Sequence, residues 1–97
     1  MQVQILREAE TELWEAVTEY EQIELGLGLR FKDEVQSHIK AIRQHPTLPR
    51  IRENNYRRVN LRMFPFYLAY LIRAETVYLI AIAHAKRKPG YWKERKV

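Results

Sequence analysis

Side chains that can transfer protons or stabilise a phosphate lie close together near the C-terminus. They are His84, Lys86, Arg87 and Tyr91, which share one short segment. An imidazole, an amine or a phenol can transfer protons, and cationic side chains stabilise charge that develops on a phosphate. We weigh two roles for His84, either a general acid or base, or a turn residue whose ring bonds to the backbone. We favour the turn, since suggestive titratable groups are often structural.

The three histidines and the absence of cysteine argue against a metal site. His38 falls beside the apolar stripe of a predicted helix, as expected of a residue at the boundary of a buried face. His45 directly precedes Pro46 and is expected to face solvent. Because protein zinc sites use grouped histidines and cysteines, we expect no metal and no cofactor.

The charges divide the chain into an acidic and a basic half. Residues 1–48 hold 5 Lys/Arg and 9 Asp/Glu, a net charge of −4, whereas residues 49–97 hold 12 and 3, a net charge of +9. This asymmetry indicates a polyanionic partner, either nucleic acid or an acidic protein segment. Four arginines, Arg50, Arg52, Arg57 and Arg58, could bind it. Alternatively, they form a solvated sheet edge that discourages aggregation.

The elements that must position these residues follow from the hydrophobic spacing. Residues 3–6 predict a short strand, and a helical period begins at Glu8. Its apolar face comprises Ala9, Leu13, Ala16, Val17, Tyr20 and Ile23. A second helix is expected to begin within residues 27–30 and to end before Pro46 and Pro49. Its apolar stripe comprises Leu27, Phe31, Val35, Ile39 and Ile42.

The second half of the chain is rich in β-branched and aromatic residues. Residues 56–61, 66–72 and 77–83 predict three strands, joined by short connections over residues 62–65 and 73–76. The last strand is apolar on both faces and should be central, whereas the first carries arginines and should lie near an edge. We therefore predict an α+β domain in the order β-α-α-β-β-β, with a helical hairpin on one face of a small, mostly antiparallel sheet.

Length and hydropathy limit the class of protein. Ninety-seven residues suit one domain, and a basic tail over residues 84–97 follows its last strand. The N-terminus has no pattern of a signal peptide, and the longest uncharged stretch, residues 63–72, is too short to cross a bilayer. We expect a soluble, cytoplasmic protein with no membrane contact.

An ordered set of motifs over nearly the whole chain resembles the RelE/ParE toxin superfamily. These motifs are ELWEAV (12–17), GLGLRF (26–31) with Asp33 to Val35, Pro46 and Pro49, Arg57-Arg58, FPF (64–66), and AHAKRKPGYW (83–92) with Arg95. The last motif directly follows an apolar strand and is specific for the ParE-like branch. The resemblance implies the fold, a bacterial type II toxin role, and a cognate antitoxin usually encoded beside the toxin.

The resemblance leaves the target open. ParE-like members poison DNA gyrase, whereas RelE-like members cut mRNA in the ribosome. Tyr67 stands where an arginine is common in the cleaving enzymes, so we favour a ParE-like gyrase inhibitor. The alternative is an mRNA interferase, a metal-independent endoribonuclease whose nearest catalytic matches are Lys86, Arg87 and Tyr91. A third alternative is a degenerate relative that retains only antitoxin binding.

Two sets of residues are candidates for contact with the partners of this protein. The target-binding set is Lys86, Arg87, Lys88, Tyr91, Trp92 and Arg95. Tyr91 and Trp92 have a second role open to them, which is to fold back and close the end of the core. The antitoxin-binding set is Arg50, Arg52, Arg57, Arg58 and Trp14. A homodimer, or a heterotetramer with the antitoxin, would be compatible with these surfaces.

Overall fold

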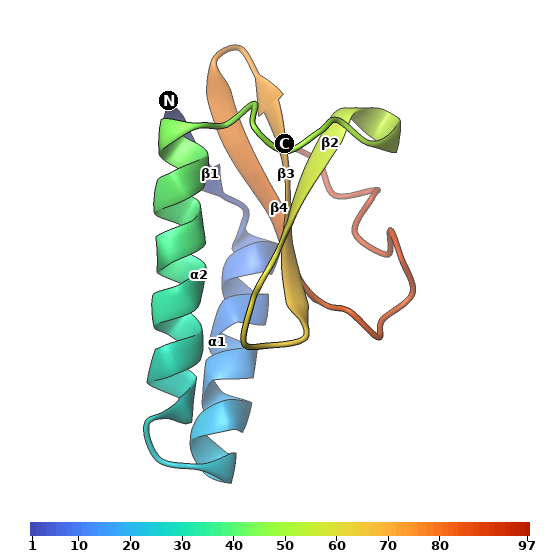
Figure 1. Cartoon of the computed structure of the whole chain (residues 1–97). Helices are drawn as coiled ribbons and strands as arrows, with labels where there is room; N and C mark the ends of the chain where they lie inside the picture. Colours follow the sequence, from blue (N-terminus) through green and yellow to red (C-terminus); the bar gives the residue numbers. More distant parts are fainter.

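Two antiparallel helices form one layer of the computed structural model, which describes residues 1–97 (Figure 1). They are α1 (Arg7–Ile23) and α2 (Leu27–Gln44). The turn between them uses Gly26 at φ 90°, a conformation that other residues resist. A Cβ added to Gly28 would lie 2.3 Å from the carbonyl oxygen of Val17, so only glycine permits this approach of the helices.

The buried faces of both helices match the predicted stripes except at the tip of the hairpin. Ala9, Ala16 and Val17 of α1 are buried, as are Phe31, Val35 and Ile42 of α2. Ile23 was expected to continue the stripe of α1, and this prediction is wrong because the side chain is 73% exposed. The hairpin extends past the end of the sheet there, so no strand covers its tip (Figure 1).

The second layer is a four-stranded sheet with the order β1-β4-β3-β2. Its strands are β1 (Gln2–Ile5), β2 (Tyr56–Asn60), β3 (Phe66–Arg73) and β4 (Thr76–His84), with a short 3-10 helix η1 (Glu53–Asn55) before β2. β1 pairs parallel with β4, and the other pairs are antiparallel. The predicted element order and mostly antiparallel sheet are confirmed. β4 is central and β2 is an edge strand, as predicted.

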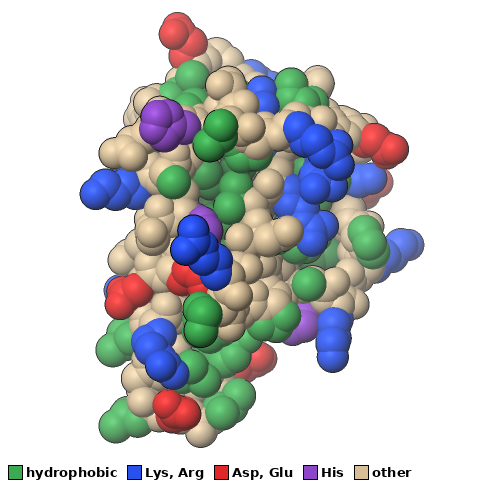
Figure 2. Space-filling model, viewed as in Figure 1, with side chains coloured by type: hydrophobic (Ala, Val, Ile, Leu, Met, Phe, Trp, Pro, Cys, Tyr) green, Lys and Arg blue, Asp and Glu red, His purple; other side chains and the backbone are tan.

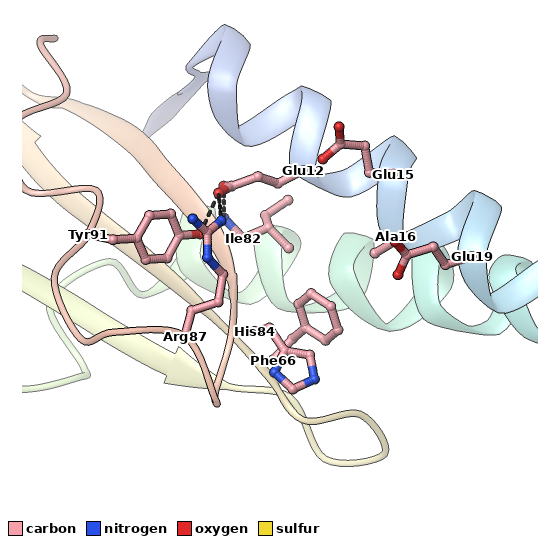
Figure 3. A pocket seen from close by; sticks show the side chains of 9 residues that line it. All are labelled: Glu12, Glu15, Ala16, Glu19, Phe66, Ile82, His84, Arg87 and Tyr91. Atoms are coloured by element: carbon pink, nitrogen blue, oxygen red, sulfur yellow. Dashed lines mark hydrogen bonds and ion pairs between the residues drawn. The ribbon is translucent and has the colours of Figure 1, made fainter.

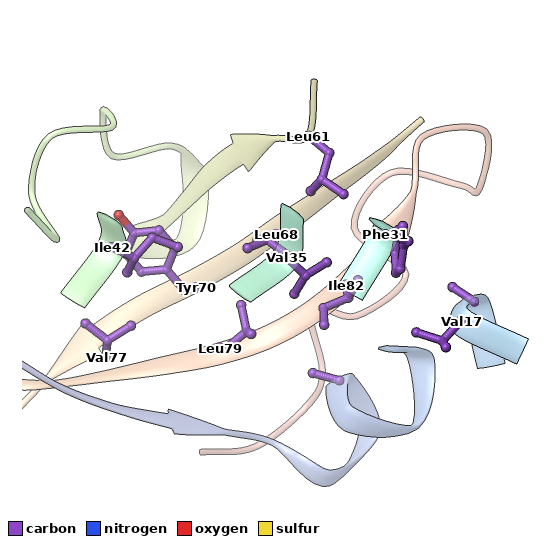
Figure 4. Close-up of a cluster of buried hydrophobic side chains, with 12 residues drawn as sticks. Val17, Phe31, Val35, Ile42, Leu61, Leu68, Tyr70, Val77, Leu79 and Ile82 are labelled. Carbon is purple, nitrogen blue, oxygen red and sulfur yellow. The ribbon is translucent and has the colours of Figure 1, made fainter. Parts of the chain in front are cut away.

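Apolar side chains cover both faces of this sheet. On one face, the helices pack on Leu68, Tyr70, Val77, Leu79 and Ile82 (Figure 4). On the other face lies a second cluster, made of Tyr67, Ala69, Ile80, Ala81, Ala83 and Trp92. Trp92 belongs to residues 85–97, here called the strap, which lies on the side of the sheet away from the helices (Figure 1). The apolar outer face of β4 therefore has a cover that the hydrophobic spacing did not identify.

Neither helix is both long and apolar enough to cross a membrane.

Candidate functional site

The carboxylate of Glu12 on α1 is the centre of a polar cluster between the helices and the strap (Figure 3). Its Oε1 accepts hydrogen bonds from the backbone N–H of Ile82 at 3.0 Å and from Arg95 Nη1 at 2.9 Å. Its Oε2 accepts from Arg95 Nη2 at 2.9 Å and from the hydroxyl of Tyr91. Arg87 Nη1 lies 3.9 Å from the same oxygen. The side chain of Glu12 is only 11% exposed.

This cluster shifts the pKa values of two strap residues further from the physiological range. The hydrogen bonds to Glu12 raise the pKa of Arg95, against the opposing effect of burial. Burial first, and then the hydrogen bond to Glu12, raise the pKa of Tyr91 well above its ordinary value of 10.0. Arg95 therefore remains cationic and Tyr91 remains a protonated phenol over the physiological pH range.

Trp92 anchors the strap to the outer face of the sheet. Its side chain is only 2% exposed, and its indole N–H donates to the hydroxyl of Tyr67 at 3.0 Å. Its ring meets that of Tyr56 edge-on, with 4.6 Å between the centroids. The guanidinium of Arg58 lies 3.8 Å above the ring of Tyr67. Trp92 thus has the second role considered from the sequence, that of closing the core.

Between these anchors and β4, the exposed side chains of Lys86, Arg87 and Lys88 form what is here called the cationic loop. The loop is attached to the strand end by the N–H of Ala85, which donates to the carbonyl of Pro65 at 2.7 Å. The N–H of Lys86 donates to Nδ1 of His84 at 3.0 Å, so the predicted turn role of this histidine is confirmed.

A cavity of about 160 Å³ lies between α1 and the strap (Figure 3). It is lined by Glu12, Glu15, Ala16, Glu19, Phe66, Ile82, His84, Arg87 and Tyr91. Glu15 and Glu19 are exposed and have no hydrogen-bond or ion-pair partner in the chain, which distinguishes them from Glu12. Glu12 therefore holds the strap at this cavity, whereas the side chains of Glu15 and Glu19 stay open to solvent.

The four arginines predicted to bind an antitoxin separate into two kinds. Arg57 Nη1 donates to the carbonyls of Thr47 at 3.2 Å and Pro49 at 2.6 Å, so it holds the loop after α2. Arg58 is half-buried over the sheet and donates to Asn60 at 2.9 Å. The guanidinium groups of Arg50 and Arg52 make no hydrogen bond or ion pair with the chain.

Trp14, the fifth candidate for antitoxin binding, lies apart from these arginines. It is 48% exposed on α1, in a groove with Glu10, Glu15 and Glu19. The Nζ of Lys32 lies 5.3 Å from its ring centroid. The structure therefore does not bring the five predicted residues together as one surface.

Glu34 on α2 is a second anchor, with its side chain 15% exposed. Its carboxylate accepts hydrogen bonds from the backbone N–H groups of Arg62 and Met63 and lies 2.9 Å from His38 Nε2. Burial disfavours its ionised form, but these hydrogen bonds outweigh burial and lower its pKa. His38 is half-buried at the boundary of the apolar face and His45 is exposed, as both were predicted to be.

Sequence reasoning missed Glu12, because acidic residues in the first turns of a helix are explained by the helix dipole alone. One signal could have identified it. Glu12 lies three residues after Ala9 and four before Ala16, within the buried stripe of α1. A charged residue in such a stripe requires a buried partner, because an unpaired buried charge is costly.

No group of three or more histidines, cysteines or carboxylates in the structure could hold a metal ion.

The family described as "ParE toxin of type II toxin-antitoxin system, parDE" matches residues 3–89 of this sequence. The chain belongs to the ParE toxin family. Its fold is similar to that of a chain in a solved structure titled "Chromosomal ParDE TA system from P. aeruginosa", with a TM-score of 0.80 and 17% sequence identity. The similarity covers 89% of this chain and 97% of that chain. No curated protein matches the sequence significantly.

Within this ParE-family fold, the three candidate catalytic residues are poorly arranged for proton transfer. The hydroxyl of Tyr91 already donates to Glu12, and its raised pKa makes it a weak acid. The guanidinium of Arg87 lies 3.7 Å above the ring of Tyr91, with its side chain still 57% exposed, and Lys86 is exposed as well. Efficient general acid–base catalysis needs a group with a pKa near the working pH. The hydroxyl of Tyr91, which such catalysis would use, is instead occupied by its hydrogen bond to Glu12.

Proposed function

We propose that this ParE-family chain arrests growth by binding DNA gyrase through the cationic loop, and that a cognate antitoxin neutralises it. The observation that carries the proposal is the loop itself. Lys86 and Lys88 are exposed, and Arg87 stays 57% exposed while it lies against Tyr91. The segment that carries them is attached at both ends, by Pro65 and by Glu12. A rigid group of cations loses little conformational freedom when it binds an acidic surface.

The same geometry argues against mRNA cleavage as the basis of toxicity. β3 contributes no cation to the outer face of the sheet before Arg73, and Tyr67 is buried beneath Trp92. A metal-independent ribonuclease needs cations around the scissile phosphate and a group that transfers protons. In this chain, Tyr91 is bonded to Glu12 and the strap covers the sheet. We therefore expect purified protein to leave mRNA intact on programmed ribosomes.

The surfaces open to an antitoxin are partly apolar and partly basic. At the tip of the helical hairpin, Ile23, Leu25 and Leu29 are 73%, 92% and 57% exposed. Figure 2 shows hydrophobic side chains at the lower end of the molecule, where Figure 1 places the hairpin tip, and a group of Lys and Arg side chains over β2. An acidic amphipathic segment could bury the first surface and pair with the second. Antitoxin neutralisation in the cytoplasm, where gyrase acts, is part of this proposal.

Induction of the toxin in cells, with two assays on the same cultures, tests the choice of target. Gyrase-linked DNA breaks are expected, whereas cuts at the ribosomal A site are not. A variant with Lys86, Arg87 and Lys88 changed to Gln should produce neither DNA breaks nor growth arrest, while its antitoxin complex and melting temperature persist. Site-specific mRNA cuts that disappear in an Arg87→Ala variant would instead establish the interferase alternative. Full toxicity of the triple variant would place the active surface on the helical hairpin around Trp14.

A further inference from the structure

We propose that Glu12 is the positioning residue of the cationic loop, because its carboxylate holds the strap in the one arrangement that presents Lys86, Arg87 and Lys88 together. The inference rests on the proposed function, in which this loop contacts the target. It assigns a role in toxicity to an acidic residue in the acidic half of the chain, 83 positions before its main partner Arg95.

The contacts of Glu12 join three separate parts of the fold. One carboxylate binds the backbone of β4 at Ile82 and two side chains of the strap, and it does so from α1. Arg95 completes the junction, since its Nη1 also donates to the carbonyl of Ile80 at 3.0 Å. Beyond residue 90, the strap's other hydrogen bond to the rest of the fold runs from Trp92 to Tyr67. Without Glu12, Tyr91 and Arg95 would lose their side-chain acceptors.

The link from Glu12 to the cationic loop passes through Arg87. The guanidinium of Arg87 lies 3.7 Å above the ring of Tyr91 and 3.9 Å from the carboxylate of Glu12. The ring of Tyr91 and the carboxylate of Glu12 orient Arg87, and Tyr91 is itself held by Glu12, so the direction of Arg87 depends on Glu12. Its side chain is still 57% exposed, so it remains accessible to a partner while its direction is set. A long cationic side chain that is already oriented loses less entropy on binding than a free one.

The Glu12→Gln variant tests this role against a matched control, Glu15→Gln. Glu15 lies on the same helix and lines the same cavity, but it makes no bond to the strap. We expect Glu12→Gln to accelerate amide hydrogen exchange over residues 91–95 and tryptic cleavage after Lys86 and Arg87, each by about tenfold. Exchange in α2 and β3 should stay unchanged in both variants. Unchanged protection of the strap in Glu12→Gln would overturn the inference.

Toxicity assays then separate positioning from simple attachment. We expect Glu12→Gln to weaken growth arrest and binding to purified gyrase by about tenfold, with antitoxin binding retained and Glu15→Gln unaffected. Glu12→Asp, which keeps the charge on a shorter side chain, should recover part of the loss. A strap that is released while gyrase binding stays at the parental level would refute the positioning role. If the Lys86/Arg87/Lys88 neutral variant is itself fully toxic, the proposed function fails instead, whatever Glu12→Gln does.

Loss of Glu12 leaves the cation of Arg95 without its partner, so Glu12→Gln could fail to fold. Arg95→Gln provides the second test, because it leaves Glu12 bonded to Ile82 and Tyr91. We expect this variant to release residues 93–97, with a smaller loss of gyrase binding because Tyr91 still supports Arg87. Gyrase binding by a folded Arg95→Gln protein that is lost as fully as in the Lys86/Arg87/Lys88 neutral variant would contradict the proposal, because both supports of Arg87 are still present.

Discussion

The indole N–H of Trp92 donates to the phenolic oxygen of Tyr67 at 3.0 Å, in a buried contact between the strap and β3. This pair gives the sheet a second hydrophobic core on the face away from the helices. The tryptophan therefore belongs to the folded core, whereas the cations that precede it remain in solvent. Substitutions in the strap should accordingly divide into those that affect stability and those that affect partner binding.

The first prediction concerns the stability of the second core. Trp92→Ala should lower the free energy of unfolding by about 3–5 kcal/mol, as expected for truncation of a large buried aromatic residue. Tyr67→Phe should cost about 1–3 kcal/mol, because it leaves the buried indole N–H without an acceptor. Urea denaturation followed by circular dichroism measures both. An exposed aromatic change, Trp14→Ala, is the control, and an equal loss in all three variants would mean that the strap is not a core element.

A second prediction concerns the turn between β3 and β4. Ala74 and Glu75 both have positive φ, at 50° and 61°, in a two-residue hairpin turn. Such turns favour Asn-Gly, because other side chains crowd the backbone there at a cost of about 1–2 kcal/mol per residue. Ala74→Asn combined with Glu75→Gly should raise the free energy of unfolding by about 1 kcal/mol, net of the added chain entropy. Ala74→Val should lower it, and thermal melting compares the two.

The order of elements could be predicted because each has its own hydrophobic period. The stripes of α1 and α2 recur every three or four residues, and residues 77–83 are apolar on both faces. This last feature also indicated that both faces of β4 would be covered. It could not show what covers the outer face, because the strap has no regular secondary structure and therefore no period.

The site was predicted less well, because charge alone does not distinguish a binding residue from an anchor. Arg57, Arg58 and Arg95 were counted as cations for partners, yet each makes a hydrogen bond inside the fold. Arg58 bonds to Asn60 on the same strand, whereas Arg57 bonds to the carbonyls of the loop after α2 and Arg95 bonds to the distant Glu12. The pairings of Arg57 and Arg95 arise only in the tertiary structure. The exposed cations, Lys86 and Lys88 among them, remain candidates for binding partners.

A third prediction follows from the lowered pKa of Glu34. Folding holds its pKa below the ordinary value of 4.5, so its ionised form stabilises the folded state above that pH. This contribution should be lost as the pH falls from 4.5 through the folded-state pKa. The difference in unfolding free energy between the parent and Glu34→Gln should thus be largest near neutral pH, at about 1–3 kcal/mol, and shrink at low pH.

Urea titrations across this pH range measure the effect, with Asp33→Asn as the control because Asp33 is exposed and unpaired. His38 faces the same carboxylate, so a His38→Ala background separates its contribution from that of the backbone donors at Arg62 and Met63. A difference between parent and Glu34→Gln that does not change with pH would show that Glu34 acts through packing and not through its charge.

The last prediction distinguishes the two kinds of arginine in the basic half. The guanidinium groups of Arg50 and Arg52 are free of hydrogen bonds within the chain, whereas Arg57 binds the carbonyls of Thr47 and Pro49. Reversal of Arg50 and Arg52 to Glu should weaken the binding of an acidic antitoxin by about tenfold or more at low salt, because charge–charge interactions are least screened at low salt. Arg57→Gln should instead lower the free energy of unfolding by about 1–3 kcal/mol, since it frees the loop after α2. Calorimetric titration with the antitoxin across a salt series, together with urea denaturation, measures both effects. Antitoxin affinity that is unchanged by the double reversal at every salt concentration would mean that the complex forms mainly through the apolar tip at Leu25.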